Sequence, residues 1–553
     1  MPDLQRDTVR SLRKALKRLY LRRREKIPYN ADSRKPMTKF FNTAGPVNPE
    51  KHYYVAHRFN ETEIRQLVTQ EKYFILHAPR QSGKTTGLLQ LVKMFNSEGQ
   101  YHALYANFEA AQAARAQYNY ALPIILQELA TRAHEQLPEE KEFLKIFEDI
   151  KREAVPAGSL LSTLLSRWCA QSKKPIILFI DEIDSLVGDT LISVLRQLRS
   201  GYDKRPANFP QSLCLIGVRD VRDYRIYSDE QQTMVLGGSA FNIKAESLTL
   251  ASFTRAQVEN LYRQHTAETG QKFTDEAIDY AFEQTQGQPW LVNALAYQAC
   301  FRDITDRSQV ITKETLERAK EVLIQRQDTH LDVLIDRLNE PRVYKIIDAI
   351  INGQSEKRFF PHDDILYCTD LGLIKKDKYE IANPIYQDIF PRALTSSLQN
   401  QIDTKSLFYK NSDGSINGTT LIKEFQQFFR ENSVSLLENF NYLESGPHLV
   451  MMAYLQRVIN GGGTVHREYA LGRKRVDLLA KYRDQRIVIE LKVWQGPSTL
   501  KEGLEQTAEY MDVSNATEGH LIIFDQRPSK SWDEKLYQRQ ETCNGKTITV
   551  WGA

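Results

Sequence analysis

The sequence predicts an α/β protein whose first large domain holds a parallel sheet covered by helices on both faces. Strand-like and helix-like patterns alternate between Phe41 and about Val235, which is typical of strands joined by helical crossovers. Two apolar runs, 73–77 and 176–180, are short and almost unbroken, as expected for strands buried on both faces. Each run leads into residues that suit phosphate or metal binding, so fold and function are predicted from the same two places.

The loop after the first apolar run carries the most specific signal in the chain. The stretch Tyr73–Thr86 has the pattern of a strand, a small-residue loop and the start of a helix. Gly83 lets the backbone turn its N–H groups inward, Lys84 can reach the outer phosphates of a nucleotide, and Thr85 offers a hydroxyl to magnesium. Ala78 stands where the usual GxxxxGK[ST] pattern has its first glycine. The residues predicted to contact the nucleotide here are Gln81, Ser82, Gly83, Lys84, Thr85 and Thr86.

The second apolar run supports this prediction. Residues 176–180 lead into Asp181 and Glu182, which places two carboxylates where a buried strand emerges. In a nucleotide hydrolase of this kind Asp181 would hold a magnesium ion and Glu182 would polarise the attacking water. The next strand, 213–217, is followed by Arg219, whose charge could sense the terminal phosphate or could merely pair with a neighbouring aspartate. The sequence leaves both interpretations of Arg219 open.

Helical patterns follow this core. Helices are expected over 254–264 and 274–284, each opened by a threonine that suits an N-cap, and Pro289 stands at the start of a third, apolar helix. Between 343 and 394 the pattern predicts two helices, a short hairpin and a final helix, which together make a small winged helix. A winged helix either binds DNA or serves as an intramolecular clasp, and the sequence does not decide between them.

Composition limits the classes of function. The chain of 553 residues is too long for one core, and 74 Lys and Arg nearly balance 70 Asp and Glu, so the net charge of +4 says little about partners. The five cysteines lack the spacing of a zinc site or a disulfide framework, which fits a reducing cytoplasm. No apolar run is long enough to span a bilayer and no signal-peptide core is found at the N-terminus. We therefore expect a cytoplasmic protein without a membrane partner.

The N-terminal arm is the exception to this charge balance. Eight arginines and lysines between Arg10 and Arg24 surround apolar residues at helical spacing, which predicts an amphipathic basic helix. Such a helix could follow a phosphate backbone, or it could pack on its own protein.

A second candidate site lies near the C-terminus. Strands are predicted at 464–468, 475–479 and 486–493, after a helix closed by three glycines. In the third strand the period of two puts Glu490 and Lys492 on the same face.

The residues around this pair suit metal-assisted hydrolysis. Asp477 stands among apolar residues, where an unpartnered carboxylate would be costly to bury, so a metal ion is an economical partner. With Glu490 it could hold the cation, while Lys492 would orient the nucleophile or neutralise developing charge. Gln506 and Tyr510, four residues apart on the following helix, share one face and could brace the site or a DNA backbone.

The stretch 41–394 resembles AAA-like ATPases near the signal-transduction (STAND) branch. Gly83–Thr85 and Asp181–Glu182 match the Walker motifs of that family, and Arg219 matches the arginine after its sensor strand. Pro289 belongs to its Gly-x-Pro turn, which in that family lies against the adenine. The resemblance, which extends to a bacterial group of ATP-binding proteins, implies ATP and Mg²⁺ as ligands.

The final stretch, from about Pro447, is similar to PD-(D/E)xK restriction-endonuclease-like nucleases. Val476 replaces the proline that gives the motif its name. The resemblance implies Mg²⁺ or Mn²⁺ as cofactor and DNA as substrate, with RNA not excluded. The residues that it assigns to catalysis or metal binding are Glu468, Asp477, Glu490, Lys492 and Gln506, the last within a QxxxY motif that ends at Tyr510.

The combined hypothesis is an ATPase that controls a magnesium-dependent DNA nuclease, for which a host-defence role against foreign DNA is an analogy. The rival hypothesis is a nucleotide switch whose nuclease-like domain is inactive and only binds nucleic acid or a protein partner. A homo-oligomer stays open. The expected segments are a basic arm (1–40), an ATPase core (41–235), a helical lid (236–330), a winged helix (331–399), a linker with helices (400–446) and a nuclease-like domain (447–553).

Overall fold

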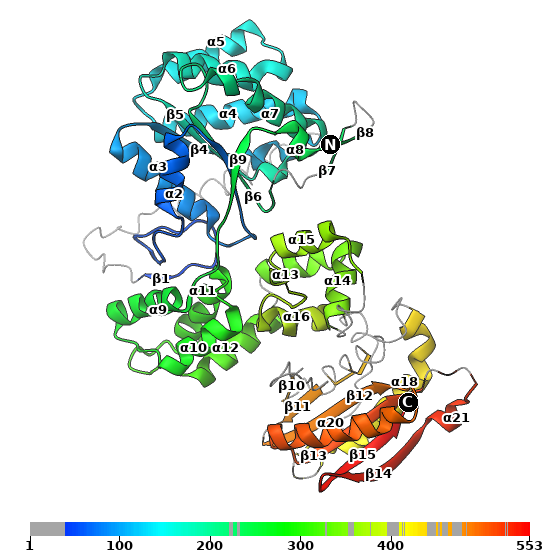
Figure 1. The fold of residues 1–553 in the computed structure, drawn as a ribbon. Coiled ribbons are helices and arrows are strands. Elements are labelled where there is room, and N and C mark those ends of the chain that lie inside the picture. Colours follow the sequence, from blue (N-terminus) through cyan, green and yellow to red (C-terminus); the bar gives the residue numbers. More distant parts are fainter. Residues whose placement is uncertain are drawn as a thin grey trace, which may run out of the picture.

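A computed structural model gives the fold of the chain (Figure 1). Residues 1–38 of the predicted basic arm, Glu468 and Asp477 lie outside the residues that it describes. The structure describes residues 39–220, 225–228, 233–326, 329–351, 359–376, 378–394, 409–411, 413, 415–438, 450–451, 454–455, 463–466, 478–482, 484–525, 527 and 529–553.

A five-stranded parallel sheet forms the centre of the first domain, in the order β4-β5-β6-β3-β9. Strands β3, β5 and β6 lie at the runs 73–77, 176–180 and 213–217 that the sequence predicts, but no such run marks the edge strand β9. It pairs along the whole of β3 and therefore extends the core to Thr249, past the boundary expected at residue 235. Its bounds and those of the other strands are β3 (Tyr73–His77), β4 (His102–Asn107), β5 (Ile176–Asp181), β6 (Ser212–Gly217) and β9 (Lys244–Thr249).

Helices cover both faces of this sheet, as predicted. Phe74 and Leu76 of β3 pack against the helices of one face, while Tyr73 and Ile75 point to the other. A small hairpin, β7 (Arg225–Ser228) with β8 (Thr233–Leu236), and the short α8 (Gly237–Ala240) follow β6. The first face carries α2 (Glu61–Thr69) and α3 (Lys84–Glu98), and the second α4 (Tyr118–Gln136), α5 (Lys141–Glu153), α6 (Ala157–Gln171) and α7 (Gly188–Ser200).

The lid lies beneath the core in Figure 1 and is built from two separate parts of the sequence. Thr254 and Thr274 cap its first two helices, as the sequence predicts. Phe41 and Tyr53, from the short strands that precede the core, pack with Tyr262 and His265 of the lid. Its elements are β1 (Phe40–Phe41), β2 (His52–Tyr53), α9 (Arg255–Thr269), α10 (Asp275–Thr285), α11 (Pro289–Gln298) and α12 (Lys313–Arg326).

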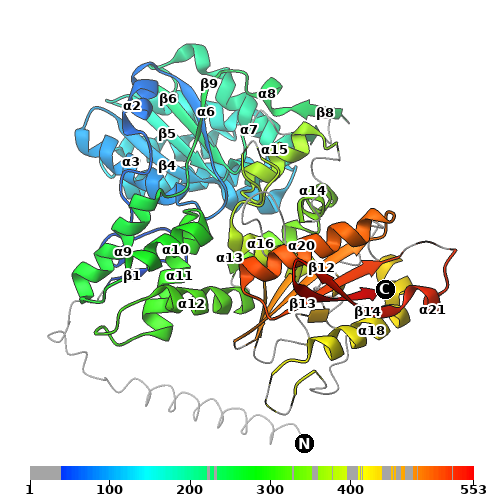
Figure 2. The ribbon, with the colours of Figure 1, turned by 60° about the horizontal axis from the view of Figure 1, so that its bottom comes forward.

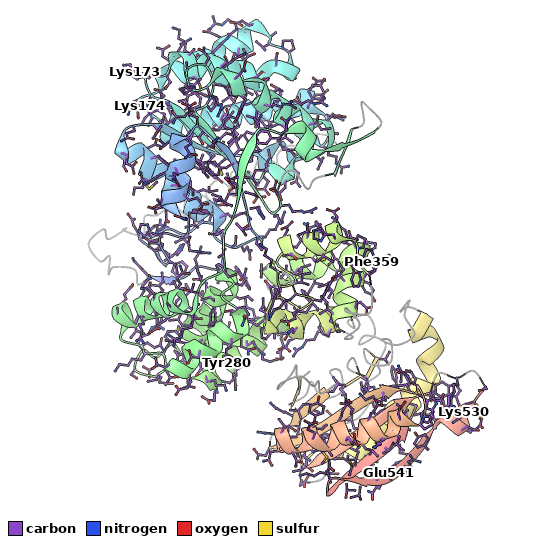
Figure 3. The ribbon with its side chains drawn as sticks, viewed as in Figure 1. Lys173, Lys174, Tyr280, Phe359, Lys530 and Glu541 are labelled. Carbon is purple, nitrogen blue, oxygen red and sulfur yellow. The ribbon has the colours of Figure 1, made fainter. Side chains whose placement is uncertain are left out.

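The helices predicted for the winged helix are present beside the lid. The expected hairpin is reduced to a single antiparallel bridge between Ile374 and Ile381. Phe359 at the outer end of this segment is 96% exposed (Figure 3). The predicted helices are α14 (Pro341–Ile351), α15 (His362–Asp370) and α16 (Pro384–Leu394), and α13 (Thr329–Arg337), which was not predicted, precedes them.

The C-terminal domain holds a six-stranded mixed sheet, in the order β10-β11-β12-β13-β15-β14. The first three strands are antiparallel, while β12, β13 and β15 run parallel. Helices α18 and α20 pack on opposite faces of the sheet (Figure 2). The elements are α18 (Gly418–Glu438), β10 (Gly463–His466), β11 (Leu478–Tyr482), β12 (Gln485–Val493), α20 (Ser498–Ser514), β13 (Glu518–Phe524), α21 (Trp532–Lys535), β14 (Tyr537–Cys543) and β15 (Lys546–Gly552).

Across the described part of the chain, we find no helix with the length and apolar character that a membrane crossing requires.

Candidate functional site

The loop between β3 and α3 curls around the Lys84 ammonium group. Gly83 has a φ of +89°, in the left-handed region that favours glycine, and this turn starts α3 at Lys84. The Lys84 Nζ donates hydrogen bonds to the carbonyls of Ala78 (2.7 Å) and Pro79 (3.1 Å). The side chain is only 6% exposed, and burial lowers the pKa of its ammonium group. A buried cation held by neutral carbonyls is well prepared to receive a phosphate.

The carboxylate of Asp181 accepts hydrogen bonds from two hydroxyl groups next to this lysine. The Thr85 hydroxyl donates to Asp181 Oδ2 at 2.8 Å, and the Tyr105 hydroxyl donates to the same oxygen at 3.0 Å. The Glu182 backbone N–H donates to the other carboxylate oxygen at 3.0 Å. A hydroxyl and a carboxylate at this separation are the kind of oxygen ligands that Mg²⁺ prefers, so these residues fit the predicted metal.

Glu182 follows Asp181 in the left-handed backbone region, with φ +54°. Burial raises the pKa of its carboxyl group to about 7, and the negative charges of Asp184 and Asp181 add to the rise, while Lys84 opposes it. A carboxyl group with a pKa near neutrality is suited to accept a proton from water.

Some of these groups reach a cavity of about 370 Å³ between the core and the lid, whereas the predicted Asp181 is fully buried and is not among its lining residues. Lys84, Thr85 and Glu182 line its polar part. Phe253 and Trp290 supply apolar surface from the lid side, as a nucleotide base requires. Of the predicted nucleotide-binding residues, those that line the cavity are Gln81, Gly83, Lys84, Thr85, Thr86 and Pro289, whereas Ser82 is buried within the loop.

Two further features of this cavity are absent from the predicted site. Residues 42–47 line it, and the Trp290 indole N–H donates to the Thr43 carbonyl at 2.9 Å. Arg58 donates to the carbonyls of Ser82 and Ala251 and lies over the Phe253 ring at 4.4 Å. Arg58 therefore joins the phosphate-binding loop to the chain that enters the lid, a role that only its position just upstream of the loop could have suggested.

The structure does not bring Arg219 into the cavity. Its guanidinium contacts α15 of the winged helix, with Nε 3.1 Å from Asp370 Oδ2 and Nη2 3.5 Å from Asp363 Oδ1. Tyr367 of the same helix lies under the guanidinium at 5.1 Å. The sequence suggested a neighbouring aspartate as the alternative partner, but these partners lie more than 140 residues further along the chain. Arg219 therefore connects the end of β6 to the winged helix.

The C-terminal candidate residues meet in part. Glu490 is fully buried on the face of β12 that packs against α20, and the Lys492 ammonium lies 2.8 Å from its Oε1. Tyr510 is buried on α20, and Gln506 is half-buried one turn before it. Asp477 is outside the described residues, like Glu468. Within the described ranges, no three His, Cys, Asp or Glu side chains gather as they would to hold a metal ion.

Comparison with known proteins assigns residues 42–392 to a protein family. No curated protein matches it. Among solved structures, a Walker-type ATPase of Pyrococcus abyssi is 15% identical and aligns over 63% of this chain and 99% of its own, with a TM-score of 0.44. The ORC2 protein of Aeropyrum pernix, solved as ADPNP–ADP complexes, is 13% identical over 61% of this chain and 93% of its own (TM-score 0.39). Cdc6p of Pyrobaculum aerophilum is 14% identical over 64% and 98% (TM-score 0.34).

These TM-scores are too low to add to the assignment. The family model carries it, because the model of the AAA-like domain matches residues 42–392, from the segment that lines the cavity to the last turn of the winged helix. The chain therefore belongs to the AAA-like domain family.

Proposed function

We propose that this protein binds and hydrolyses ATP between the core and the lid, and that the bound nucleotide controls a metal-dependent DNA nuclease at the C-terminus. The observation that carries the ATPase part is the 2.8 Å contact between Thr85 and the buried Asp181, because Thr85 and Lys84 both line a cavity of about 370 Å³.

The residues of this cavity divide the work of phosphoryl transfer. Lys84 exchanges the Ala78 and Pro79 carbonyls for phosphate oxygens, and Thr85 with Asp181 would hold Mg²⁺, which neutralises charge on the phosphates when it is bound. Glu182 orients the attacking water and accepts its proton.

We propose that Arg219 transmits the nucleotide state. It stands just after the core strand β6 and binds Asp363 and Asp370 on α15. A triphosphate would compete with these carboxylates for the guanidinium, and loss of the contact would release the winged helix from the core. The winged helix precedes the C-terminal domain in the chain, so its release would change the access of DNA to that domain.

The nuclease proposal rests on Glu490 and Lys492, which share one face of β12 beside α20. Glu468, Asp477 and Glu490 would hold Mg²⁺ or Mn²⁺, and Lys492 would orient the nucleophile. One observation favours a second candidate function. Lys492 already neutralises Glu490 at 2.8 Å, so the carboxylate can be buried without a metal ion. In that case the domain would bind nucleic acid or a protein without cleaving it.

A cleavage assay separates the two candidates. Purified full-length protein is incubated with single- and double-stranded DNA and RNA, with Mg²⁺ or Mn²⁺, and with or without ATP. A nuclease degrades at least one substrate, and Lys492→Ala abolishes the degradation. If the wild-type protein degrades nothing and Lys492→Ala binds the same substrates equally well, the nuclease proposal fails while the ATPase proposal stands.

A further inference from the structure

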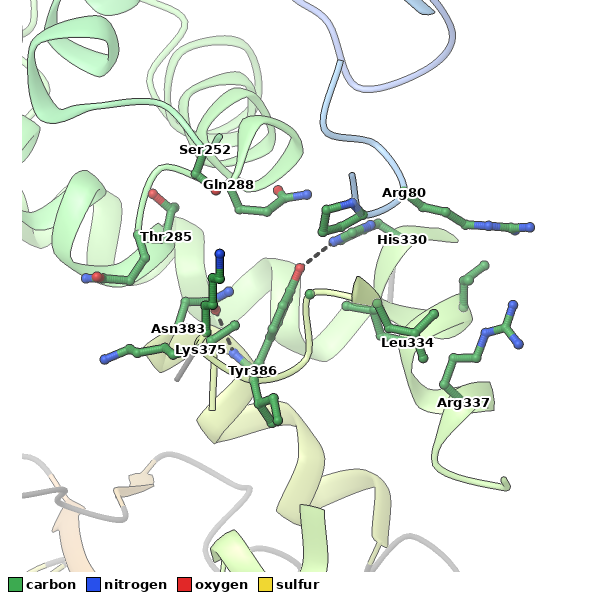
Figure 4. Close-up of a pocket in the computed structure, with 18 residues that line it drawn as sticks. Arg80, Ser252, Thr285, Gln288, His330, Leu334, Arg337, Lys375, Asn383 and Tyr386 are labelled. Atoms are coloured by element: carbon green, nitrogen blue, oxygen red, sulfur yellow. Dashed lines mark hydrogen bonds between the residues drawn. The ribbon is translucent and has the colours of Figure 1, made fainter. Parts of the chain in front are cut away.

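A second cavity, of about 300 Å³, lies on the winged-helix side of the phosphate-binding loop (Figure 4). The loop itself, the lid, α13 and the winged helix all contribute to its wall. Arg80 is the one described residue that lines both this cavity and the nucleotide cavity. The proposed ATPase chemistry uses none of the other residues around it, so the second cavity calls for a separate explanation.

The charge of this cavity selects the ligand. Four cationic residues line it, and no acidic residue stands among the described lining residues. Arg337 pairs with Glu340 and Lys375 with Glu380. Neither Arg80 nor Lys376 has an ion-pair partner within the described part of the chain. A ligand that carries negative charge is therefore favoured over a neutral or cationic one.

The rest of the wall combines apolar and aromatic surface with uncharged polar side chains from Ser252, Thr285, Gln286, Gln288 and Asn383. Leu334, Leu371 and Ile374 supply aliphatic surface, and the rings of His330 and Tyr386 stand side by side, joined by a 2.7 Å hydrogen bond between His330 Nε2 and the Tyr386 hydroxyl (Figure 4). Burial lowers the pKa of His330 to about 3, so this ring is neutral and adds no charge. Such a wall suits a flat, apolar body, and the volume suits a small molecule.

We infer that this cavity binds a small organic anion with a flat apolar body, such as an aromatic carboxylate, sulfonate or phosphate monoester. The ligand would touch the phosphate-binding loop and the winged helix at once. These two parts already meet closely, because a Cβ added to Gly372 would lie 2.8 Å from Pro79 Cγ. An occupied cavity would hold the winged helix on the loop.

The same geometry couples this site to the nucleotide cavity. Trp290, which lines the nucleotide cavity, lies against His330 with ring centroids 4.8 Å apart. Arg80 faces both cavities, and a ligand anion would draw its charge away from the nucleotide. The coupling rests on the proposed ATP binding, whereas the anion site does not. Coupling is reciprocal, so each ligand changes the affinity of the other by the same factor.

The probe for the site is 8-anilinonaphthalene-1-sulfonate, a flat aromatic anion whose fluorescence rises in apolar surroundings. It is titrated into full-length protein saturated with ADP and Mg²⁺, so that the nucleotide cavity is filled. Lys376→Glu is expected to lower the affinity for the probe about fivefold. Lys378→Glu is the matched control, since it makes the same charge change at an exposed lysine of the same turn that does not line the cavity. N-phenyl-1-naphthylamine, which lacks the sulfonate, should respond to neither variant.

A second variant locates the probe independently of charge. Ala382→Trp fills the cavity and is expected to abolish saturable binding of the probe, while circular dichroism and nucleotide binding show that the variant is folded. The site is overturned if Ala382→Trp leaves the affinity of the probe unchanged, or if the two lysine variants weaken it equally. Lys84→Ala should still bind the probe although it no longer binds nucleotide. Failure of the ATPase proposal can therefore be told apart from failure of the anion site. If the probe binds as expected and the affinity for ADP does not change with it, the coupling is overturned and the site stands.

Discussion

The two candidate sites of this chain hold a lysine in different ways. In the AAA-like domain, Lys84 rests on two neutral carbonyls, and the nearby Asp181 is engaged by hydroxyl donors. In the C-terminal domain, Lys492 is paired directly with the buried Glu490. The charge of Lys84 is therefore available to an incoming anion, whereas the charge of Lys492 is neutralised by Glu490. A lysine beside a buried carboxylate is weak evidence for a catalytic site unless its charge remains available to a ligand.

The largest effect expected from this difference is on ATP turnover. Glu182→Gln removes the proposed base with little change of shape, so turnover should fall about 10³-fold while ATP still binds. A coupled ATPase assay and a nucleotide-binding titration measure the two quantities. In the wild-type protein the rate should rise between about pH 6 and 8, because a base must be deprotonated and the pKa of Glu182 is raised to about 7. Unchanged turnover in Glu182→Gln would remove this residue from its role.

The next effect is on nucleotide affinity. Lys84→Ala removes the ammonium group that the phosphates would bind, and ATP affinity should fall about 100-fold. The matched control is Lys93→Ala, at an exposed position on the same helix. Isothermal titration with ATP and Mg²⁺ measures both, and equal affinities in the two variants would contradict the proposed binding mode.

The comparison of the two lysines is tested most directly by the free energy of unfolding of each domain, measured without ligands. Lys492→Met removes the ammonium group that lies 2.8 Å from the buried Glu490 carboxylate and should destabilise the C-terminal domain by about 2 kcal/mol. Lys84→Met removes a buried cation that contacts no carboxylate among the described residues, so the AAA-like domain should change by less than about 1 kcal/mol. Urea unfolding followed by hydrogen exchange assigns each change to its domain. The double variant Glu490→Gln, Lys492→Met should recover most of the loss, and a large loss in Lys84→Met would undo the distinction.

The smallest effect concerns the winged helix. Arg219→Gln removes the ion pairs to Asp363 and Asp370, so amide exchange in α15 should accelerate about tenfold at constant pH. Lys375→Gln serves as a control, because it breaks a more exposed pair within the winged helix itself. If exchange in α15 is the same in Arg219→Gln as in the wild-type protein, Arg219 does not hold the winged helix on the core.

The features that the sequence predicts correctly are those encoded locally. The phosphate-binding loop, the strand before Asp181 and the capped helices of the lid each occupy a short stretch with its own pattern. Strand β9 has no such pattern, because it is an edge strand with Lys244, Glu246 and Ser247 in place of an apolar run.

Contacts between residues far apart in the chain could not be predicted from local sequence patterns. The contact of Arg219 with α15 joins residues far apart in the chain, and neither side alone indicates the other. The same holds for Arg58, whose two carbonyl partners belong to the loop and to the entrance of the lid. The sequence predicts that Lys492 and Glu490 share a face, but it does not predict the 2.8 Å distance between them.

The strands that precede the core belong to the lid, where the Tyr53 hydroxyl lies 3.2 Å from His265 Nδ1. The polypeptide thus crosses between lid and core twice, once before α2 and once after β9, and Arg58 fastens these crossings to each other and to the loop. If the lid moves relative to the core, both connecting segments must change conformation together. A fragment that begins at α2 would lose one of these segments along with part of the hydrophobic centre of the lid, and its nucleotide binding would not report on the whole protein.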